Sequence, residues 1–393
     1  MNKVRAYILY ILAALCLLPT SCIEPPLHLP GQQVLTEMPQ VQTDLKVVWN
    51  IDADWSVNWH YGWDADDIAR WGDIGYSEPT SYQVRRYFKG DSQEPYHPEV
   101  DPPFSIRGTS FRRYFSFGYY DILFWSDIDS PDGTQVLVVN ESPNSVTATT
   151  TGVRGLSRRV SQLIGGAEEI DDGTTIIGMK NQPEIFYAAY PQNIYISRNL
   201  DDYIYDPVEN IYIKKIETQL RPLVYIYLVQ VVLHNNDGRI KGINGNSALS
   251  SMASGTDLYT GHTNNSPSVI YFDTRLKRNL NIDGETCDII GGKLTTFGLC
   301  DMEPYTRAGN QYTGSRSELN NYLFFDLLFS NDGVKTYSYD VTDQCQSQSH
   351  GGVITVHIDC QKLTPPDDDK QGEGSLFVPT VEDYEEVFWE FEM

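Results

Sequence analysis

Apolar and polar residues alternate in short runs along most of the chain, the pattern of strands with one buried face. In the first run, Leu45, Val47 and Trp49 fall on one side. The longest run, 223–234, is rich in β-branched and aromatic residues. Runs of this kind predict strands at 45–49, 82–88, 116–125, 134–140, 193–197, 211–213, 216–219, 223–234, 239–243, 269–273, 293–300, 322–330, 336–341, 353–359 and 387–391.

The segments between these runs have the composition of turns and loops. Residues 235–238 read Asn-Asn-Asp-Gly, a hairpin turn signal. We expect a long loop at 152–182, with a short helix near 156–164, and a Ser/Gly/Asn-rich loop at 244–267. No amphipathic helix alternates with the strands, which argues against a parallel α/β fold. The pattern predicts an all-β chain of antiparallel β-sandwich type.

The length of 393 residues predicts two tandem domains, at about 150 residues per domain. A proline-rich stretch precedes the first strand and has the composition of a tether. The predicted division is a signal peptide at 1–21, a lipidated tether at 22–40, an N-terminal β-sandwich domain with long loops at 41–206 and a C-terminal β-sandwich domain at 207–393.

Composition narrows the function by exclusion. With 40% hydrophobic and 12% aromatic residues, the chain is too apolar to be disordered. It has 29 basic and 53 acidic side chains, a formal net charge of −24. This charge excludes nucleic acid as a partner, because a polyanion needs a basic surface. It also argues against direct binding of the protein surface to anionic lipids.

The first residues predict export. Lys3 and Arg5 precede an apolar stretch at 7–18, which is short for a membrane span. Pro-Thr-Ser-Cys follows at 19–22 and resembles a bacterial lipoprotein signal, with Pro19 in place of the usual leucine. We expect cleavage before Cys22 and attachment of a diacylglycerol with palmitate-type chains to its thiol, which would hold the chain at a membrane. Cleavage of an ordinary signal peptide is the alternative.

Lipidation would place the protein at the cell outer membrane, because Ile23 after the cysteine provides no inner-membrane retention signal. The periplasmic and the surface-exposed side of that membrane both stay open.

Export also changes the interpretation of the six cysteines. Cys16 leaves with the signal, and Cys22 takes the lipid. The other four could form two disulfides in an oxidising compartment, in any of three pairings, or pack as reduced thiols: Cys287, Cys300, Cys345 and Cys360. The spacing of cysteines and histidines predicts no metal site.

Tryptophans gather in the segment 49–71. Exposed indoles are flat apolar surfaces that suit a protein partner or a sugar ring. The candidate contact residues are Trp55, Trp59, Trp63 and Trp71. Packing of the segment against a sandwich is the alternative, and the sequence favours it. The chain has no G-x-S-x-G, H-E-x-x-H or P-loop motif, so we predict no catalytic residue and no cofactor.

Several short motifs resemble those of fimbrillin-like lipoproteins of Bacteroides-type bacteria, above all a family catalogued only as a domain of unknown function. The matching runs are Asn-Gln-Pro-Glu at 181–184, Arg-Pro-Leu at 221–223, Phe-Gly at 297–298, Tyr-Asp-Val-Thr-Asp-Gln at 339–344 and Val-Glu-Asp-Tyr at 381–384. The resemblance covers most of the mature chain. It implies two transthyretin-like or immunoglobulin-like β-sandwich domains and no catalysis.

The resemblance also implies a mode of assembly. Polymerising relatives add a strand to a neighbour's open sheet, and stalk subunits first lose their own first strand by cleavage after an arginine. Here no arginine lies between Cys22 and Arg70, and Lys46 is the only lysine there. The hypothesis is a pilus anchor, an accessory subunit or a cell-surface adhesion protein, with other fimbrillin-like subunits as partners. A glycan-binding surface lipoprotein that uses residues 49–71 is the alternative.

Overall fold

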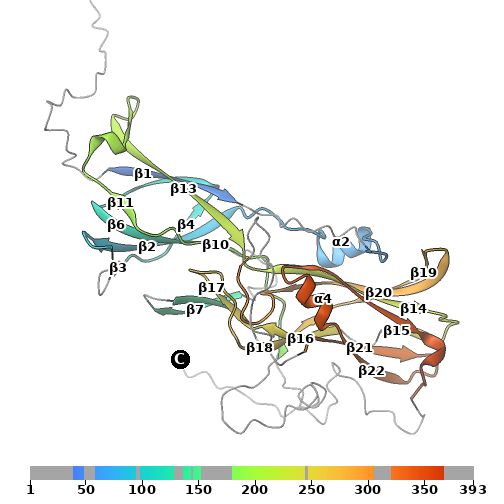
Figure 1. Cartoon of the computed structure of the whole chain (residues 1–393). Coiled ribbons are helices and arrows are strands. Elements are labelled where there is room, and N and C mark those ends of the chain that lie inside the picture. The colour runs from blue at the N-terminus through green and yellow to red at the C-terminus, as the bar shows by residue number, and fades with distance from the viewer. Residues whose placement is uncertain are drawn as a thin grey trace, which may run out of the picture.

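The computed structural model describes residues 39–47, 58–93, 98–127, 136–142, 145–151, 179–243, 247–304 and 320–366. Over these ranges the chain is all-β, as the alternating pattern predicts, and its strands form four sheets (Figure 1). The helix expected near 156–164 and the strand expected at 387–391 lie outside the described residues.

Ten strands form the first sheet: β1 (Gln40–Val47), β2 (Ser81–Gly90), β3 (Glu99–Val100), β4 (Phe104–Arg107), β5 (Ser110–Tyr114), β6 (Gly118–Ser126), β10 (Tyr187–Ala189), β11 (Ile194–Ile196), β12 (Ile204–Asp206) and β13 (Ile211–Pro222). The order is β3-β2-β6-β10-β13-β1-β5, and β4, β11 and β12 pair with β2, β6 and β13. The layer with β1 and β13 lies over the layer with β2 and β6 (Figure 1). Val41 and Leu220 from one layer share a buried core with Val84 and Phe124 from the other, so this sheet is a sandwich.

Two further sheets form a second sandwich. The first has four strands in the order β19-β20-β14-β23, namely β14 (Tyr225–His234), β19 (Arg275–Ile282), β20 (Glu285–Thr296) and β23 (Gly352–Asp359). The second has six, namely β9 (Met179–Lys180), β15 (Ile240–Ile243), β16 (Ser247–Ala253), β18 (Pro267–Phe272), β21 (Tyr322–Phe329) and β22 (Val334–Asp340). Its order is β15-β21-β16-β18-β9, with β22 on β21. The core between them contains Val231 and Leu233 from β14 with Leu249 and Phe325 from the opposite sheet.

A small third unit connects the two sandwiches. It consists of β7 (Val136–Ser142), β8 (Ser145–Thr150) and β17 (Gly255–Asp257), in the order β17-β8-β7. Its Ala148 packs with Leu123 and Trp125 of the first sheet and with Phe297 after β20. Strand pairing therefore crosses the boundary predicted at 206/207: β13 belongs to the first sheet, whereas β8 and β9 pair with β17 and β18. The division into 41–206 and 207–393 stays a prediction.

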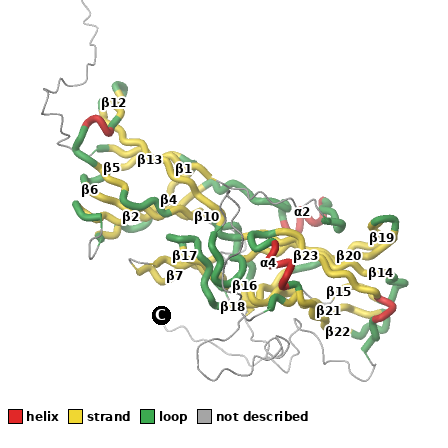
Figure 2. The backbone as a smooth tube through the Cα atoms, viewed as in Figure 1, coloured by secondary structure: helices red, strands yellow, loops and turns green. Residues whose placement is uncertain are grey.

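Helices are few and short in the described part of the chain (Figure 2). They are α2 (Ala65–Trp71), α4 (Thr342–Ser347) and the 3-10 turns Leu200–Asp202 and Cys360–Lys362. None of the helices in the described ranges is long and apolar enough to cross a membrane.

The loop expected at 244–267 is wrong, because β16 and β17 lie within it. β16 is a fully buried strand between β18 and β21, although its sequence is rich in serine. The hydroxyls have partners: Ser251 Oγ donates to the Asn320 carbonyl at 2.8 Å, and Ser250 Oγ accepts from the Tyr322 amide at 2.8 Å. Hydrogen-bonded serines can be buried at low cost, and strand propensity alone does not take this into account.

The segment 58–76 crosses the outer face of the four-stranded sheet and is anchored by Gln230 of β14. Gln230 is fully buried. Its Oε1 accepts from the amides of His60 (3.0 Å) and Tyr61 (3.2 Å). Its Nε2 donates to the Asn58 carbonyl (2.5 Å) and to Thr355 Oγ1 of β23 (2.9 Å). One side chain thus satisfies three backbone groups of the covering segment, and we call residues 58–76 the cover.

Tyr61 of the cover lies directly on Gly291 of β20, where an added Cβ would overlap the tyrosine ring. We expect Gly291→Ala to lower the free energy of unfolding by about 1–3 kcal/mol, because a well-packed site resists an extra methyl group. Urea denaturation measures the change. Gly242→Ala on β15 is the matched control, since an added Cβ there meets no atom within 4 Å. Equal losses in both variants would contradict close packing of the cover.

Candidate functional site

The first strand occupies an interior position in the first sheet. All eight residues of β1 pair in parallel with β13, from Gln40 opposite Ile213 to Val47 opposite Leu220. Gln40 to Asp44 also pair antiparallel with β5. Val41 and Thr43 are fully buried. β1 therefore lies between β13 and β5 and pairs with both. The backbone amides and carbonyls that these two strands direct toward β1 are not left unpaired at a sheet edge.

Polar side chains tie β1 to β5 on the outer surface. Gln40 Nε2 donates to Tyr114 Oη at 2.9 Å, and Arg112 Nε donates to Gln42 Oε1 at 3.3 Å. Arg112 also pairs with Glu209 beyond β12 at 2.9 Å.

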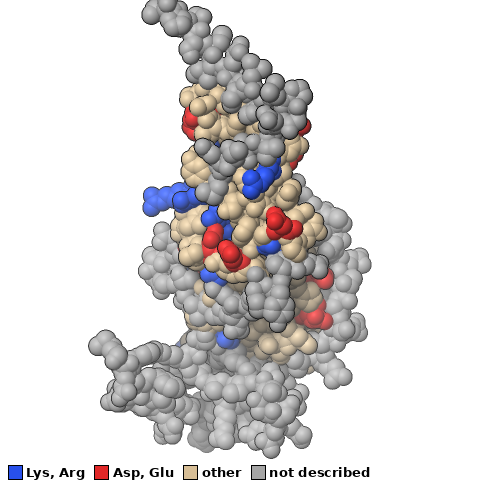
Figure 3. Space-filling view, turned by 90° about the vertical axis from the view of Figure 1, so that its left-hand side faces the viewer, with Lys and Arg blue, Asp and Glu red and all other residues tan. Residues whose placement is uncertain are grey.

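In Figure 3, which views the side at the left of Figure 1, basic and acidic side chains are interspersed.

The described part of the tryptophan segment packs against the four-stranded sheet. Trp49, Trp55 and the lipidation candidate Cys22 lie outside the described residues. Trp59, Trp63 and Trp71 come together in the cover. The ring centroids of Trp59 and Trp63 are 6.4 Å apart, and those of Trp63 and Trp71 are 5.2 Å apart. All three are half-buried against Tyr61 of the cover and against Val232, Ile282, Cys287 and Ile289 of the four-stranded sheet. Contact with a protein partner or a glycan stays a prediction.

Helix α2 holds the cover down through charge. Asp64 caps the helix and forms a capping box with Asp67. The Asp67 carboxylate is fully buried and accepts from Tyr61 Oη (2.9 Å) and from the Asp64 amide (3.0 Å). It also pairs with Arg275 (3.0 Å) and Lys277 (2.5 Å) of β19. Two cations and two hydrogen bonds compensate the burial of this carboxylate.

The four remaining cysteines are buried thiols, and the structure joins none of them in a disulfide. They are distributed over three apolar clusters: Cys345 and Cys360 in the main core, Cys300 beside the small sheet, and Cys287 beneath the cover. Burial raises the pKa of Cys345 to about 12 and that of Cys360 to about 11. In this structure the four cysteines are packed thiols, and their pairing into disulfides stays a prediction.

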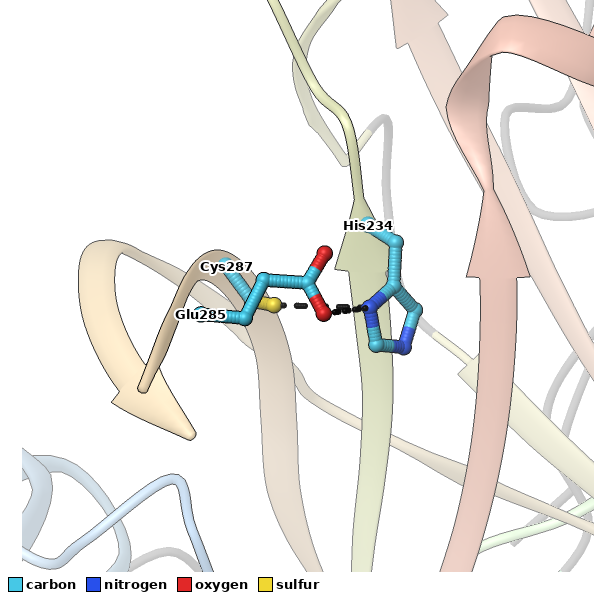
Figure 4. Close-up of side chains that lie close together, drawn as sticks. All are labelled: His234, Glu285 and Cys287. Atoms are coloured by element: carbon cyan, nitrogen blue, oxygen red, sulfur yellow. Dashed lines mark hydrogen bonds and ion pairs between the residues drawn. The ribbon is translucent and has the colours of Figure 1, made fainter. Parts of the chain in front are cut away.

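Cys287 lies in a cluster that the sequence analysis did not identify. His234 ends β14, and Glu285 and Cys287 begin β20 (Figure 4). Leu233 pairs with Asp288, so His234 comes opposite Cys287, and Glu285 follows on the same face two residues away.

The cluster is compact and partly open to solvent. His234 Nδ1 lies 3.2 Å from Glu285 Oε2 and 3.5 Å from Cys287 Sγ. His234 Nε2 lies 3.0 Å from His357 Nδ1 of β23. The Cys287 thiol is buried, whereas the Glu285 side chain is 52% exposed. Burial, followed by the neighbouring Glu285 and Asp288, raises the pKa of Cys287; burial, His234 and His60 lower that of His357.

Spacing could not reveal this cluster, because His234 on β14 is 51 residues from Glu285 on β20 in the sequence. A signal was nevertheless present: His234 precedes the turn at 235–238, and Glu285 follows Asp283-Gly284. Residues that flank two turns at one end of a sheet meet if the strands pair, but the pairing of β14 with β20 was not predictable from the alternation.

Comparisons with known proteins give a likeness in structure only. No protein-family model and no curated protein matches the chain. It is similar to a candidate adhesin from Bacteroides ovatus, at 13% identity over 84% of this chain and 95% of that one, with a TM-score of 0.44. A candidate adhesin from Bacteroides thetaiotaomicron matches at 9% identity over 82% and 93%, with a TM-score of 0.42. The fimbrial anchor protein Mfa2 from Porphyromonas gingivalis matches at 10% identity over 82% and 91%, with a TM-score of 0.37.

The cover also half-buries Lys293 of β20, whose ammonium donates to the Asp73 carbonyl at 2.5 Å. Burial lowers the pKa of Lys293 from 10.5 to about 8. Between these pH values the unfolded chain binds more protons than the folded one, so this lysine makes the free energy of unfolding rise with pH. We expect the free energy of unfolding of wild type, minus that of Lys293→Met, to rise by at most about 3 kcal/mol from pH 8 to pH 10.5. Urea denaturation across this range measures it, with Lys215→Met, an exposed lysine on β13, as control. A constant difference would contradict the burial.

Proposed function

We propose that the chain is a non-enzymatic, lipid-anchored outer-membrane protein of the fimbrillin-like class, an anchor or accessory subunit of a pilus or a cell-surface adhesion protein, that keeps its first strand. The observation that carries this proposal is the position of β1 between β13 and β5. A subunit whose first strand stays in its own sheet has no vacant slot there for a neighbour's strand. It would cap or hold an assembly instead of extending it.

The physical argument concerns unpaired backbone. Without β1, the residues of β13 from Ile213 to Leu220 and those of β5 from Ser110 to Tyr114 would expose amides and carbonyls along two edges. Such edges attract a strand from another chain. With β1 in place these groups are paired, and Val41 contributes a fully buried side chain to the core beneath. The stable state of this subunit is then the closed one.

The sequence supports retention of β1. Removal of the strand needs a cleavable bond, and no arginine lies between Cys22 and Arg70. Lys46, the only lysine in that interval, belongs to β1 itself and pairs with Gln219. A protease that cuts after basic residues must bind an extended, unpaired segment, so β1 would have to detach before cleavage at Lys46.

Glycan binding through Trp55, Trp59, Trp63 and Trp71 takes second place. Trp59, Trp63 and Trp71 pack against one another and against the sheet, which uses the indole surface that a sugar ring would need. The position of β1 in its own sheet therefore supports the closed-subunit proposal more strongly than the tryptophans support glycan binding.

Displacing β1 should convert the closed subunit into one that accepts a strand. We expect Val41→Glu to weaken the insertion of β1, since a carboxylate buried without a partner costs about 3 kcal/mol or more. The variant should then capture a fluorescent peptide of residues 39–48, whereas wild type should not. Fluorescence anisotropy measures capture, and light scattering measures the mass of each protein.

Gln42→Glu is the matched control, because the adjacent side chain is only half-buried. It should behave as wild type. Capture of the peptide by wild type as fast as by Val41→Glu, or growth of wild type into polymers, would overturn the proposal.

Lipid anchoring at Cys22 is tested separately. We expect wild type to fractionate with outer membranes and to incorporate labelled palmitate, and Cys22→Ala to be soluble and unlabelled, because the thiol is the acceptor. Cys16→Ala, which removes a cysteine that cleavage would discard, is the control. Continued labelling of Cys22→Ala would refute this part of the proposal without touching the closed-sheet argument.

A further inference from the structure

His234, Glu285 and Cys287 supply the three kinds of donor that zinc takes in proteins: imidazole nitrogen, carboxylate oxygen and thiolate sulfur. The three donor atoms lie within 4.8 Å of one another, in the only such group of at least three His, Cys, Asp or Glu residues among the described ranges. They come from paired strands, and the register of β14 with β20 fixes their separation. The cluster is therefore part of the sheet framework and does not depend on a loop.

The distances fit a tetrahedral ion. Bonds of about 2.0–2.1 Å to nitrogen and oxygen and about 2.3 Å to sulfur separate nitrogen from oxygen by about 3.3 Å and nitrogen from sulfur by about 3.5 Å at tetrahedral angles. The structure has 3.2 Å between His234 Nδ1 and Glu285 Oε2, and 3.5 Å between His234 Nδ1 and Cys287 Sγ. Both separations from His234 Nδ1 therefore match tetrahedral coordination of one ion, and the third pair, Glu285 Oε2 and Cys287 Sγ, lies within 4.8 Å.

Hydrogen bonding alone satisfies the cluster less well. A ring nitrogen carries either one proton or one lone pair. If His234 Nδ1 donates to Glu285, it cannot accept from the Cys287 thiol; if it accepts from the thiol, it faces the carboxylate without a proton. A cation resolves this conflict, because all three groups then act as donors of electron pairs to one centre.

We propose that His234, Glu285 and Cys287 bind one divalent ion of the zinc type, with the fourth coordination position open to solvent. Solvent access is present, since the His234 and Glu285 side chains are 24% and 52% exposed. Cys287 forms the buried wall of the site, within the cluster of Tyr61, Val232, Ile282 and Ile289.

A second residue layer orients the histidine. With Nδ1 on the ion, His234 keeps its proton on Nε2 and donates it to His357 Nδ1, 3.0 Å away. The two rings are stacked, with centroids 5.2 Å apart. A hydrogen bond of this kind fixes the tautomer and orientation of a ligating histidine, and its loss weakens metal binding about 10–100-fold. His357 is thus a positioning residue.

The test uses Co²⁺ as a spectroscopic substitute for zinc, added to the full mature chain after treatment with a chelator. We expect one equivalent to produce a thiolate-to-cobalt charge-transfer band together with the visible bands of tetrahedral cobalt, and Zn²⁺ to displace it. Cys287→Ser should abolish the charge-transfer band. Cys300→Ala, which removes a buried thiol from a different cluster, should retain it.

Two more variants keep the proposal falsifiable if Cys287→Ser fails to fold. Glu285→Gln changes an exposed side chain and should weaken binding of Co²⁺ at least about tenfold, and His357→Gln should do so about 10–100-fold with the charge-transfer band preserved. Absence of the band in wild type, its persistence in Cys287→Ser, or unchanged affinity in Glu285→Gln would each show that the cluster is only hydrogen-bonded.

Discussion

The fold depends on one covalent constraint: β13 and β14 are consecutive, yet each is an interior strand of a different sheet. β13 lies between β10 and β1, and β14 lies between β20 and β23. The connection contains Leu223 and Val224, both buried, and the Leu223 amide donates to the Phe186 carbonyl at 2.8 Å. Because this connection is only the two residues between Pro222 and Tyr225, the two sandwiches lie close together and share a core with the small sheet between them. The first and last described strands, β1 and β23, each pair in parallel with one strand of this central pair, β1 with β13 and β23 with β14.

A second requirement follows from the outer side of β14 and β20, which no other sheet in the described part of the chain covers. The cover shields this side from solvent, and polar side chains hold it in place. Gln230 positions its backbone and Asp67 its helix, while the indoles and Tyr61 supply apolar area between them. A buried glutamine and a buried aspartate would each destabilise the fold if left unsatisfied. Their complete hydrogen bonding ties the cover to one position on the sheet, where an apolar surface alone would permit sliding.

The alternation of apolar residues was enough to predict the interior strands β2, β6, β14 and β21 and the end strand β23, because each buries one or both faces. It failed where burial and composition diverge. β16 is buried but rich in serine, and β5 and β19 are paired but polar. β19 shows why: Arg275 and Lys277 are needed to hold Asp64 and Asp67. Trp59, Trp63 and Trp71 pack on the sheet, whereas the cluster at His234 needed the register of β14 with β20, which local sequence does not encode.

The parallel pairing of β1 with β13 determines how the subunit would carry a mechanical load. For a chain held at Cys22, tension enters β1 at Gln40 and leaves β13 toward β14, at the opposite end of the same strand pair. The eight residues of the ladder are then strained together in shear, rather than one after another as in a hairpin pulled open from its end. Forced extraction is governed by the rate of unfolding and not by equilibrium stability. A subunit tethered in this way would resist flow and traction more strongly than its free energy of folding suggests.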